Sequence, residues 1–149
     1  TTTFETMVQH HDFLEHAVIF DNHYGTSKDW VNATLQKGID VILEIDWQGN
    51  QQIKTLFPDS IGIFILPPSL DELEERLTRR NQDHPEIIQK RLNDAKDTLA
   101  HVDDIQYVVV NDDFVSALHD LKTIIEAGRL LQKQQLSKHH ALIHDLLAE

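Results

Sequence analysis

Cysteine is absent from this sequence, and methionine, proline and glycine are sparse, with one, four and five residues among 149. Without cysteine the chain forms neither a disulfide framework nor a thiolate metal site, and an intracellular setting is the easier interpretation. The five glycines include no G-x-x-x-x-G-K-[ST] pattern, which is the loop that cradles a triphosphate. The sequence by itself therefore offers no phosphate-binding loop.

Long apolar runs and an excess of basic residues are missing as well. The longest apolar stretches, such as residues 61–68, are far too short to span a bilayer, and the first residues lack the pattern of a signal peptide. We therefore predict a cytoplasmic protein with no membrane partner. The formal net charge is −12, which argues against nucleic acid as a partner, because neutralising phosphates requires a broad basic face.

What the chain does have is an alternation of apolar strand patterns with helical patterns. Three strand patterns are nearly unbroken apolar runs, as strands covered on both faces require, and they fall at residues 39–46, 61–68 and 105–112. A further strand is predicted at residues 13–20. This alternation predicts an α/β fold, a parallel sheet with helices on both faces, in which ligands lie at the carboxyl ends of the strands.

Capping signals place several of the helices. Thr26 or Ser27 is expected to cap a helix that ends before Gly38, a glycine in the position that often follows a helix. Ser69 begins a capping box and thereby a second helix. From Asp113 the chain is predicted to be helical almost to its end.

Two groups of polar residues stand out against this framework. The stretch Phe13–Ser27 sets one carboxylate, Glu15, inside an apolar strand pattern and then continues into a predicted turn, Asp21–Gly25. Four of the five arginines fall within a single 16-residue window, at positions 76, 79, 80 and 91. In so acidic a protein this cluster suggests an anion site, and the alternative is a solvated helix face whose arginines pair with neighbouring carboxylates.

Six segments in order resemble the guanylate kinases of the bacterial type, namely FLEHAVIFDNHYGTS, VILEIDWQG, FILPPS, RLTRRNQD, IIQKRL and VVVNDD. The resemblance covers essentially the whole chain. It implies phosphorylation of GMP to GDP by MgATP, a step of purine nucleotide metabolism. It also implies the P-loop NTPase-like fold of nucleoside monophosphate kinases, with a GMP-binding subdomain at residues 1–36, a core domain at 37–149 and a lid insertion at about 70–90.

The resemblance assigns the guanine-binding residues, and elementary chemistry agrees with the assignment. Glu15 and Thr26 would read the base, because a carboxylate accepts the N1–H and N2–H₂ donors of guanine together while a hydroxyl donates to O6. By resemblance, Tyr24 would bind the GMP phosphate, Gly25 would let the chain turn close to the nucleotide, and Asp46 would lie beside the guanine.

The resemblance also assigns the phosphoryl-transfer residues. Arg76 and Arg80 match lid arginines that reach the ATP phosphates, and Arg91 matches an arginine that bridges the phosphates of the two nucleotides, so all three would be catalytic. Asn111 matches a position near the adenine, and an equal interpretation is that it caps the following helix. Arg79 stands where the family often has glycine, and we expect it to be a surface residue. Mg²⁺ would enter with ATP and take none of these residues as ligands.

The family pattern contains more than these segments. In guanylate kinases a first strand, the P-loop and a Ser-x-x-Thr-Arg segment precede the counterpart of Thr1, so we expect the sequence to omit an N-terminal part of a whole enzyme. Activity of the 149-residue chain alone is then doubtful. The family also has aspartate where this chain has Glu44, whose role stays open.

Three alternatives are kept in view. The first is an inactive guanylate-kinase-like binding module, against which the arginines argue, since a module that never holds ATP has no need of them. The second is zinc bound through His140 and His144, four residues apart next to His139, but a third ligand is missing and exposed histidines are the simpler interpretation. The third concerns the apolar C-terminal helix, which could cover its own core or a second subunit, as in a homo-oligomer.

Overall fold

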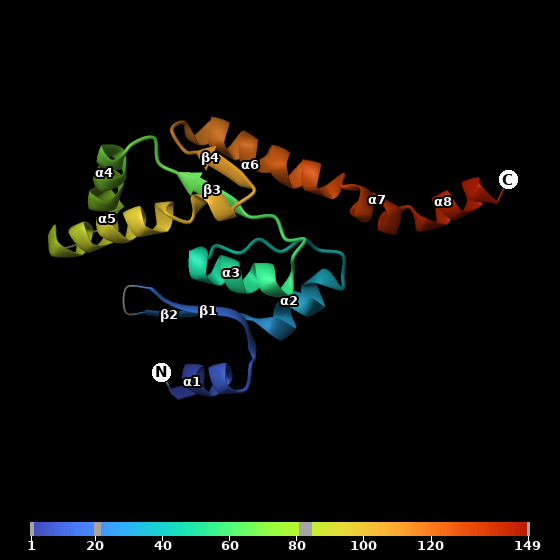
Figure 1. Ribbon diagram of the computed structural model, residues 1–149, viewed down its shortest axis with the longest axis horizontal. Coiled ribbons are helices and arrows are strands. Elements are labelled where there is room, and N and C mark those ends of the chain that lie inside the picture. The colour runs from blue at the N-terminus through green and yellow to red at the C-terminus, as the bar shows by residue number, and fades with distance from the viewer. Residues whose placement is uncertain (1, 20–21, 81–84, 149) are drawn as a thin grey trace. The chain divides into compact units, whose positions relative to one another are not determined.

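The computed structural model describes residues 2–19, 22–80 and 85–148, without the side chains of residues 80, 85, 87 and 104. The chain divides into two compact units, Thr1–Ser60 and Ile61–Glu149. Figure 1 traces the described elements from the blue helix α1 to the red helix α8. The boundary predicted after residue 36 separates a GMP-binding subdomain from a core domain. The division into compact units does not test it, so it stays a prediction.

The first unit is a hairpin with three helices. It contains α1 (Thr2–Gln9), β1 (Phe13–Ile19), β2 (Asn22–Ser27), α2 (Lys28–Leu35) and α3 (Trp47–Leu56). The two strands pair antiparallel (Figure 1). The strand predicted at residues 13–20 is confirmed over Phe13–Ile19, and its last residue lies outside the described part.

The turn predicted at Asp21–Gly25 is wrong over its described part. Asn22–Ser27 forms strand β2, in which Gly25 pairs opposite His16. A Cβ atom on Gly25 would come within 2.8 Å of the Phe13 ring. Gly25 is therefore explained by an aromatic side chain that packs across it within the hairpin, and a turn at this position is not needed.

Local capping signals are confirmed. Ser27 is the N-cap of α2, and its hydroxyl accepts a hydrogen bond from the backbone N–H of Trp30 at 3.3 Å. The helix ends at Leu35, and Gly38 adopts a left-handed φ of 73°, which glycine reaches without strain.

The strand predicted at residues 39–46 does not form. The segment is irregular, and among the described residues no strand pairs with it. Its side chains alternate in burial, because Val41, Leu43 and Ile45 pack against the buried core of Leu14, Val31 and Ile53, whereas Ile42 is 70% exposed. An extended backbone alone does not make a strand, since a ladder needs a hydrogen-bonding neighbour. The apolar run was therefore a correct signal of partial burial and a wrong signal of sheet pairing.

The second unit contains a parallel strand pair. β3 (Ile63–Leu66) and β4 (Tyr107–Val110) pair in parallel with Ile63 opposite Tyr107, so the predicted parallel arrangement is confirmed for these strands. Both are four residues long, shorter than the apolar runs that predicted them. Several of their side chains are exposed, Ile65 and Val108 among them, so burial on both faces is not found for these residues.

Helices α4 (Leu70–Arg80) and α5 (Pro85–Leu99) connect the two parallel strands, with the short 3₁₀ helix η1 (Val102–Asp104) before β4. Ser69 caps α4 as predicted, because its hydroxyl accepts the Glu72 N–H at 3.1 Å. Helix α6 (Phe114–Arg129) follows β4 and contacts it, and α7 (Gln132–Lys138) and α8 (His140–Leu147) continue from it (Figure 1). Of the helices described, none is long and apolar enough to cross a membrane.

Candidate functional site

Glu15 is the buried carboxylate of the hairpin. Its side chain is 3% exposed, and within the described residues it is the charged group that reaches this degree of burial. Glu15 pairs opposite Thr26 across the two strands, next to an irregularity in the register, and the Thr26 hydroxyl donates to Glu15 Oε1 at 2.5 Å. The structure therefore brings together the two residues predicted to read a guanine edge.

The predicted phosphate ligand Tyr24 lies on the same strand as Thr26. Residues two apart on a strand point to the same face, so Tyr24 and Thr26 share a face of β2. Tyr24 is 52% exposed, so a ligand at the surface would be able to reach its side chain. Gly25, between them, belongs to the opposite face, beside the Phe13 ring.

Asp46 occupies the N-cap of α3. Its Oδ1 accepts the Gly49 N–H at 2.9 Å, and its Oδ2 accepts from the Gln48 amide at 3.0 Å. Both oxygens are therefore engaged in starting the helix. The position of Asp46 beside a guanine stays a prediction, and Glu44, two residues earlier, is exposed.

Helix α3 contributes two residues to the surroundings of Glu15 that were not singled out from the sequence. A Cβ atom on Gly49 would lie 2.8 Å from Glu15 Oε2. The Gln52 side chain binds both backbone groups of His16, with its Nε2 donating to the carbonyl at 2.9 Å and its Oε1 accepting the N–H at 3.1 Å. The quoted motif VILEIDWQG contains Gly49, which was the available signal, but nothing local indicates its contact with Glu15.

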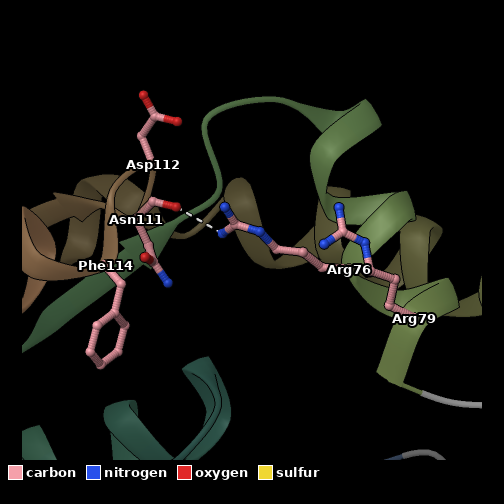
Figure 2. A pocket seen from close by; sticks show the side chains of 5 residues that line it. All are labelled: Arg76, Arg79, Asn111, Asp112 and Phe114. Atoms are coloured by element: carbon pink, nitrogen blue, oxygen red, sulfur yellow. Dashed lines mark hydrogen bonds between the residues drawn. The ribbon is translucent and has the colours of Figure 1, made fainter.

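In the second unit an open hollow of about 300 Å³ lies where β4 ends. It is lined by Arg76, Arg79, Asn111, Asp112 and Phe114. Figure 2 shows the Arg76 side chain extended from α4 toward the Asn111 backbone, with the Arg79 guanidinium beside it. The hollow thus combines cationic groups, an amide and an aromatic ring at the carboxyl end of a parallel strand.

Arg76 links α4 to the end of β4. Its Nε donates to Glu72 Oε1 at 2.7 Å, and its Nη1 donates to the Asn111 carbonyl at 2.7 Å, as the dashed line in Figure 2 marks. The Glu72 pair is of the kind that a solvated helix face would form. The bond to Asn111 is not, because it joins two elements that are 35 residues apart in the chain.

Arg79 is on the surface as predicted, with its side chain 67% exposed and paired with Glu75 at 2.5 Å. The hydrogen bond and the charge of Glu75 raise the pKa of Arg79 above its usual value. Nevertheless Arg79 lines the hollow together with Arg76, because residues three apart lie on one side of a helix. Its role as a neighbour of Arg76 was missed.

The interpretation of Asn111 as a helix cap is wrong. Asp113 is the N-cap of α6, and its Oδ1 accepts from the backbone N–H and the hydroxyl of Ser116 at 2.9 and 2.8 Å. These hydrogen bonds lower the pKa of Asp113. Asn111 instead continues the strand pairing, since its N–H donates to the Leu66 carbonyl at 2.7 Å.

Arg91 and Arg80 are the remaining predicted cationic residues. Arg91 lies on α5 and is partly buried, which is unusual for an arginine on a merely solvated face. Arg80 ends α4, and its side chain lies outside the described part of the chain.

Comparisons with known proteins point in one direction. The family model for guanylate kinase matches residues 1–128. Relatives named guanylate kinase from Saccharophagus degradans and Vibrio parahaemolyticus are 52% and 51% identical over 145 and 146 residues, which is 97% and 98% of this chain and 71% and 70% of theirs. This chain belongs to the guanylate kinase family.

The fold agrees with that assignment. The crystal structure of guanylate kinase from Anaplasma phagocytophilum aligns with a TM-score of 0.73 at 26% identity, over 91% of this chain and 70% of that one. The likeness confirms the α/β class predicted from the strand–helix alternation.

The zinc hypothesis finds no support in the described residues. No group of three or more His, Asp or Glu side chains able to hold a metal ion is found among them. His144 approaches Asp145 at 3.7 Å, and both side chains are largely exposed.

Proposed function

We propose that this guanylate kinase family member transfers a phosphoryl group from ATP to GMP, giving ADP and GDP. The observation that carries the proposal is the buried carboxylate of Glu15, which accepts a hydrogen bond from the Thr26 hydroxyl. A buried carboxylate is expensive unless a function or a partner compensates for it. A guanine edge, with two adjacent donors, is such a partner.

The pair explains selectivity for guanine over adenine. The N1–H and N2–H₂ groups of guanine would donate to the two oxygens of Glu15. The Thr26 hydroxyl can donate only one hydrogen bond, and without ligand it donates that bond to Glu15. When the base binds, the hydroxyl would rotate and donate to O6 instead. Adenine has neither donor and would leave the carboxylate unpaired, a mismatch that a polar site rejects by about 10⁴-fold.

We propose that ATP binds in the hollow of the second unit. Arg76 uses its Nε and one Nη1 donor in internal bonds, and an arginine has five N–H donors, so others are available for phosphate oxygens. Arg80 and Arg91 would place positive charge near the transferred phosphoryl group. Phosphoryl transfer depends mainly on positioning and on stabilising the negative charge of that group. The planar guanidinium holds two phosphate oxygens at once, which lysine does not.

The adenine would lie against Asn111 and Phe114. Phe114 is 71% exposed and lines the hollow, so its ring offers a free face. Stacking of a base on an aromatic ring contributes about 1–3 kcal/mol. This accounts for an aromatic residue that is exposed at the start of α6 rather than buried in the core.

The metal ion that ATP chemistry implies would be Mg²⁺ carried by the nucleotide. Mg²⁺ uses one or two carboxylates together with substrate phosphates and water, so it does not need a cage of protein ligands. Asp112, a carboxylate of the hollow, has the chemistry of such a ligand. The substrates belong to nucleotide metabolism, so we place the protein in the cytoplasm. Self-association through the exposed leucines of α8 stays a prediction.

A coupled assay that follows ADP release tests the proposal. We expect release that depends on both ATP and GMP and that falls strongly when AMP replaces GMP. Calorimetric titration with GMP is the companion measurement. In a whole enzyme that carries the P-loop segment, binding of GMP without any ADP release would contradict phosphoryl transfer and would favour a binding module. Turnover with AMP equal to that with GMP would contradict base reading by Glu15.

A further inference from the structure

We propose that α3 is the positioning element of the guanine-reading carboxylate. In this inference Gly49 leaves the space that the Glu15 side chain occupies, and Gln52 fixes the backbone beside it. The inference rests on the proposed function, because it concerns the specificity of that same site. It adds two residues that touch neither nucleotide and act through Glu15.

Space, rather than backbone conformation, explains the glycine at position 49. Gly49 lies in the first turn of α3 and has no left-handed φ, so its backbone would accept alanine, a better helix former. An added Cβ atom would however lie 2.8 Å from Glu15 Oε2 and 3.1 Å from the Ile45 side chain. Real Cβ contacts are essentially never as short as the first of these, so one neighbour would have to move.

The Glu15 carboxylate has little freedom to give way. Its Oε1 receives the Thr26 hydroxyl, its Oε2 faces Gly49, and the side chain is almost fully buried. A methyl group at position 49 would therefore turn the carboxylate plane and break the Thr26 bond or tilt Oε2 away from the base. Either change would misalign one of the two oxygens that guanine requires.

Gln52 holds the strand at the next residue. Its amide acts as donor to the His16 carbonyl and acceptor from the His16 N–H, which are the backbone groups on the edge of β1 that faces away from β2. The Gln52 side chain thus forms, at His16, the two backbone hydrogen bonds that a neighbouring strand would otherwise form. Because Gly49 and Gln52 are three apart, one side of α3 fixes both the side chain of Glu15 and the backbone that carries it.

Such pre-organisation predicts a particular effect on specificity. GMP uses both oxygens of the carboxylate, whereas IMP lacks the N2 amine and uses one. A tilted carboxylate would therefore weaken GMP binding more than IMP binding. The ratio of the IMP dissociation constant to the GMP dissociation constant is the readout, since loss of overall stability alone would weaken both ligands alike.

Calorimetric titrations with GMP, IMP and AMP test the inference on five variants. Gly49→Ala should lower the IMP-to-GMP ratio about tenfold, which corresponds to about 1.4 kcal/mol. Gln52→Leu should lower it in the same direction, while Gln51→Leu, the same change at an exposed position of the same helix, should leave it unchanged. In the Glu15→Gln background, Gly49→Ala should change the ratio no further, because the two residues act as one unit.

Opposite outcomes would overturn the inference. These are an unchanged ratio in folded Gly49→Ala, equal effects of the Gln51 and Gln52 variants, or additivity of Gly49→Ala with Glu15→Gln. If Gly49→Ala does not fold, as judged by circular dichroism, the two glutamine variants decide. A wild-type protein that binds GMP and AMP equally would refute base reading itself, and this failure of the proposed function is recognisable before any variant is made.

Discussion

Replacing Glu15 with glutamine changes one oxygen for an NH₂ group and leaves the shape of the side chain intact. The amide oxygen can still accept the Thr26 hydroxyl, so the hairpin should keep its fold. The NH₂ group, however, would meet a guanine donor instead of accepting from it. A hydrogen bond to a charged group contributes about 1.5–3 kcal/mol. Losing one should weaken GMP binding about 10- to 150-fold, at about 1.4 kcal/mol for each factor of ten.

AMP should respond in the other direction. The N1 atom of adenine is an acceptor, so the new amide can donate to it, and AMP binding by Glu15→Gln should be equal or tighter. Calorimetric titration with both nucleotides gives the ratio directly, and thermal melts followed by circular dichroism confirm folding. Glu5→Gln, the same substitution at an exposed position of α1, is the matched control. A folded Glu15→Gln protein with the wild-type preference for GMP would refute the assignment of Glu15.

Three further substitutions test other parts of the structure. Arg91→Lys keeps the charge but loses the planar fork, so in the complete enzyme kcat should fall about 10- to 150-fold, for a lost bond of about 1.5–3 kcal/mol. The GMP KM should rise less, and a change confined to KM would contradict a transition-state role. Gly25→Ala should destabilise the protein to urea by about 1–3 kcal/mol through overlap with the Phe13 ring, and Phe13→Leu should recover part of the loss; strictly additive effects would argue against that contact. The Ser116 donors lower the pKa of Asp113, so this group stabilises the fold above the pKa of an unfolded aspartate, and the stabilisation is lost as pH falls through the lower folded pKa. The melting temperature of Asp113→Asn should therefore depend less on pH below about pH 4 than that of the wild type, and parallel curves would contradict the linkage.

Features that depend on near neighbours in the sequence could be predicted. Ser27, Ser69 and Gly38 mark helix ends through contacts within a few residues. Ser69 and Gly38 were predicted outright, and Ser27 was one of two predicted caps together with Thr26. Glu15 was recognisable as a carboxylate in an apolar strand pattern, and the structure confirms its burial beside Thr26. In these cases the residue type itself carries the structural information.

Features that depend on distant partners could not be predicted. The apolar run at residues 39–46 predicted a strand, but strand formation requires a hydrogen-bonding neighbour that no local pattern reveals. The Gln52–His16 bonds join residues 36 positions apart, and a glutamine in a polar helix looks like any exposed glutamine. Arg79 is exposed, as predicted from the sequence. Its place beside Arg76 follows from the three-residue spacing on the helix, which the prediction did not consider.

A common principle links the Glu15–Thr26 pair and the Arg76–Glu72 pair. In each, the group expected to bind a nucleotide already has an internal partner of the same chemical kind as the ligand. The Thr26 hydroxyl donates to Glu15 as a guanine N–H would, and the Glu72 carboxylate accepts from Arg76 as a phosphate oxygen would. A guanine edge would exchange the Thr26 bond for its own, so the Glu15 carboxylate would not be left unsatisfied. Arg76 has further N–H donors, so it would bind a phosphate while keeping its bond to Glu72. A ligand without the matching donors or acceptors would displace the internal partner without forming a hydrogen bond in its place. Discrimination at Glu15 would therefore depend on whether the base replaces the Thr26 bond that it displaces.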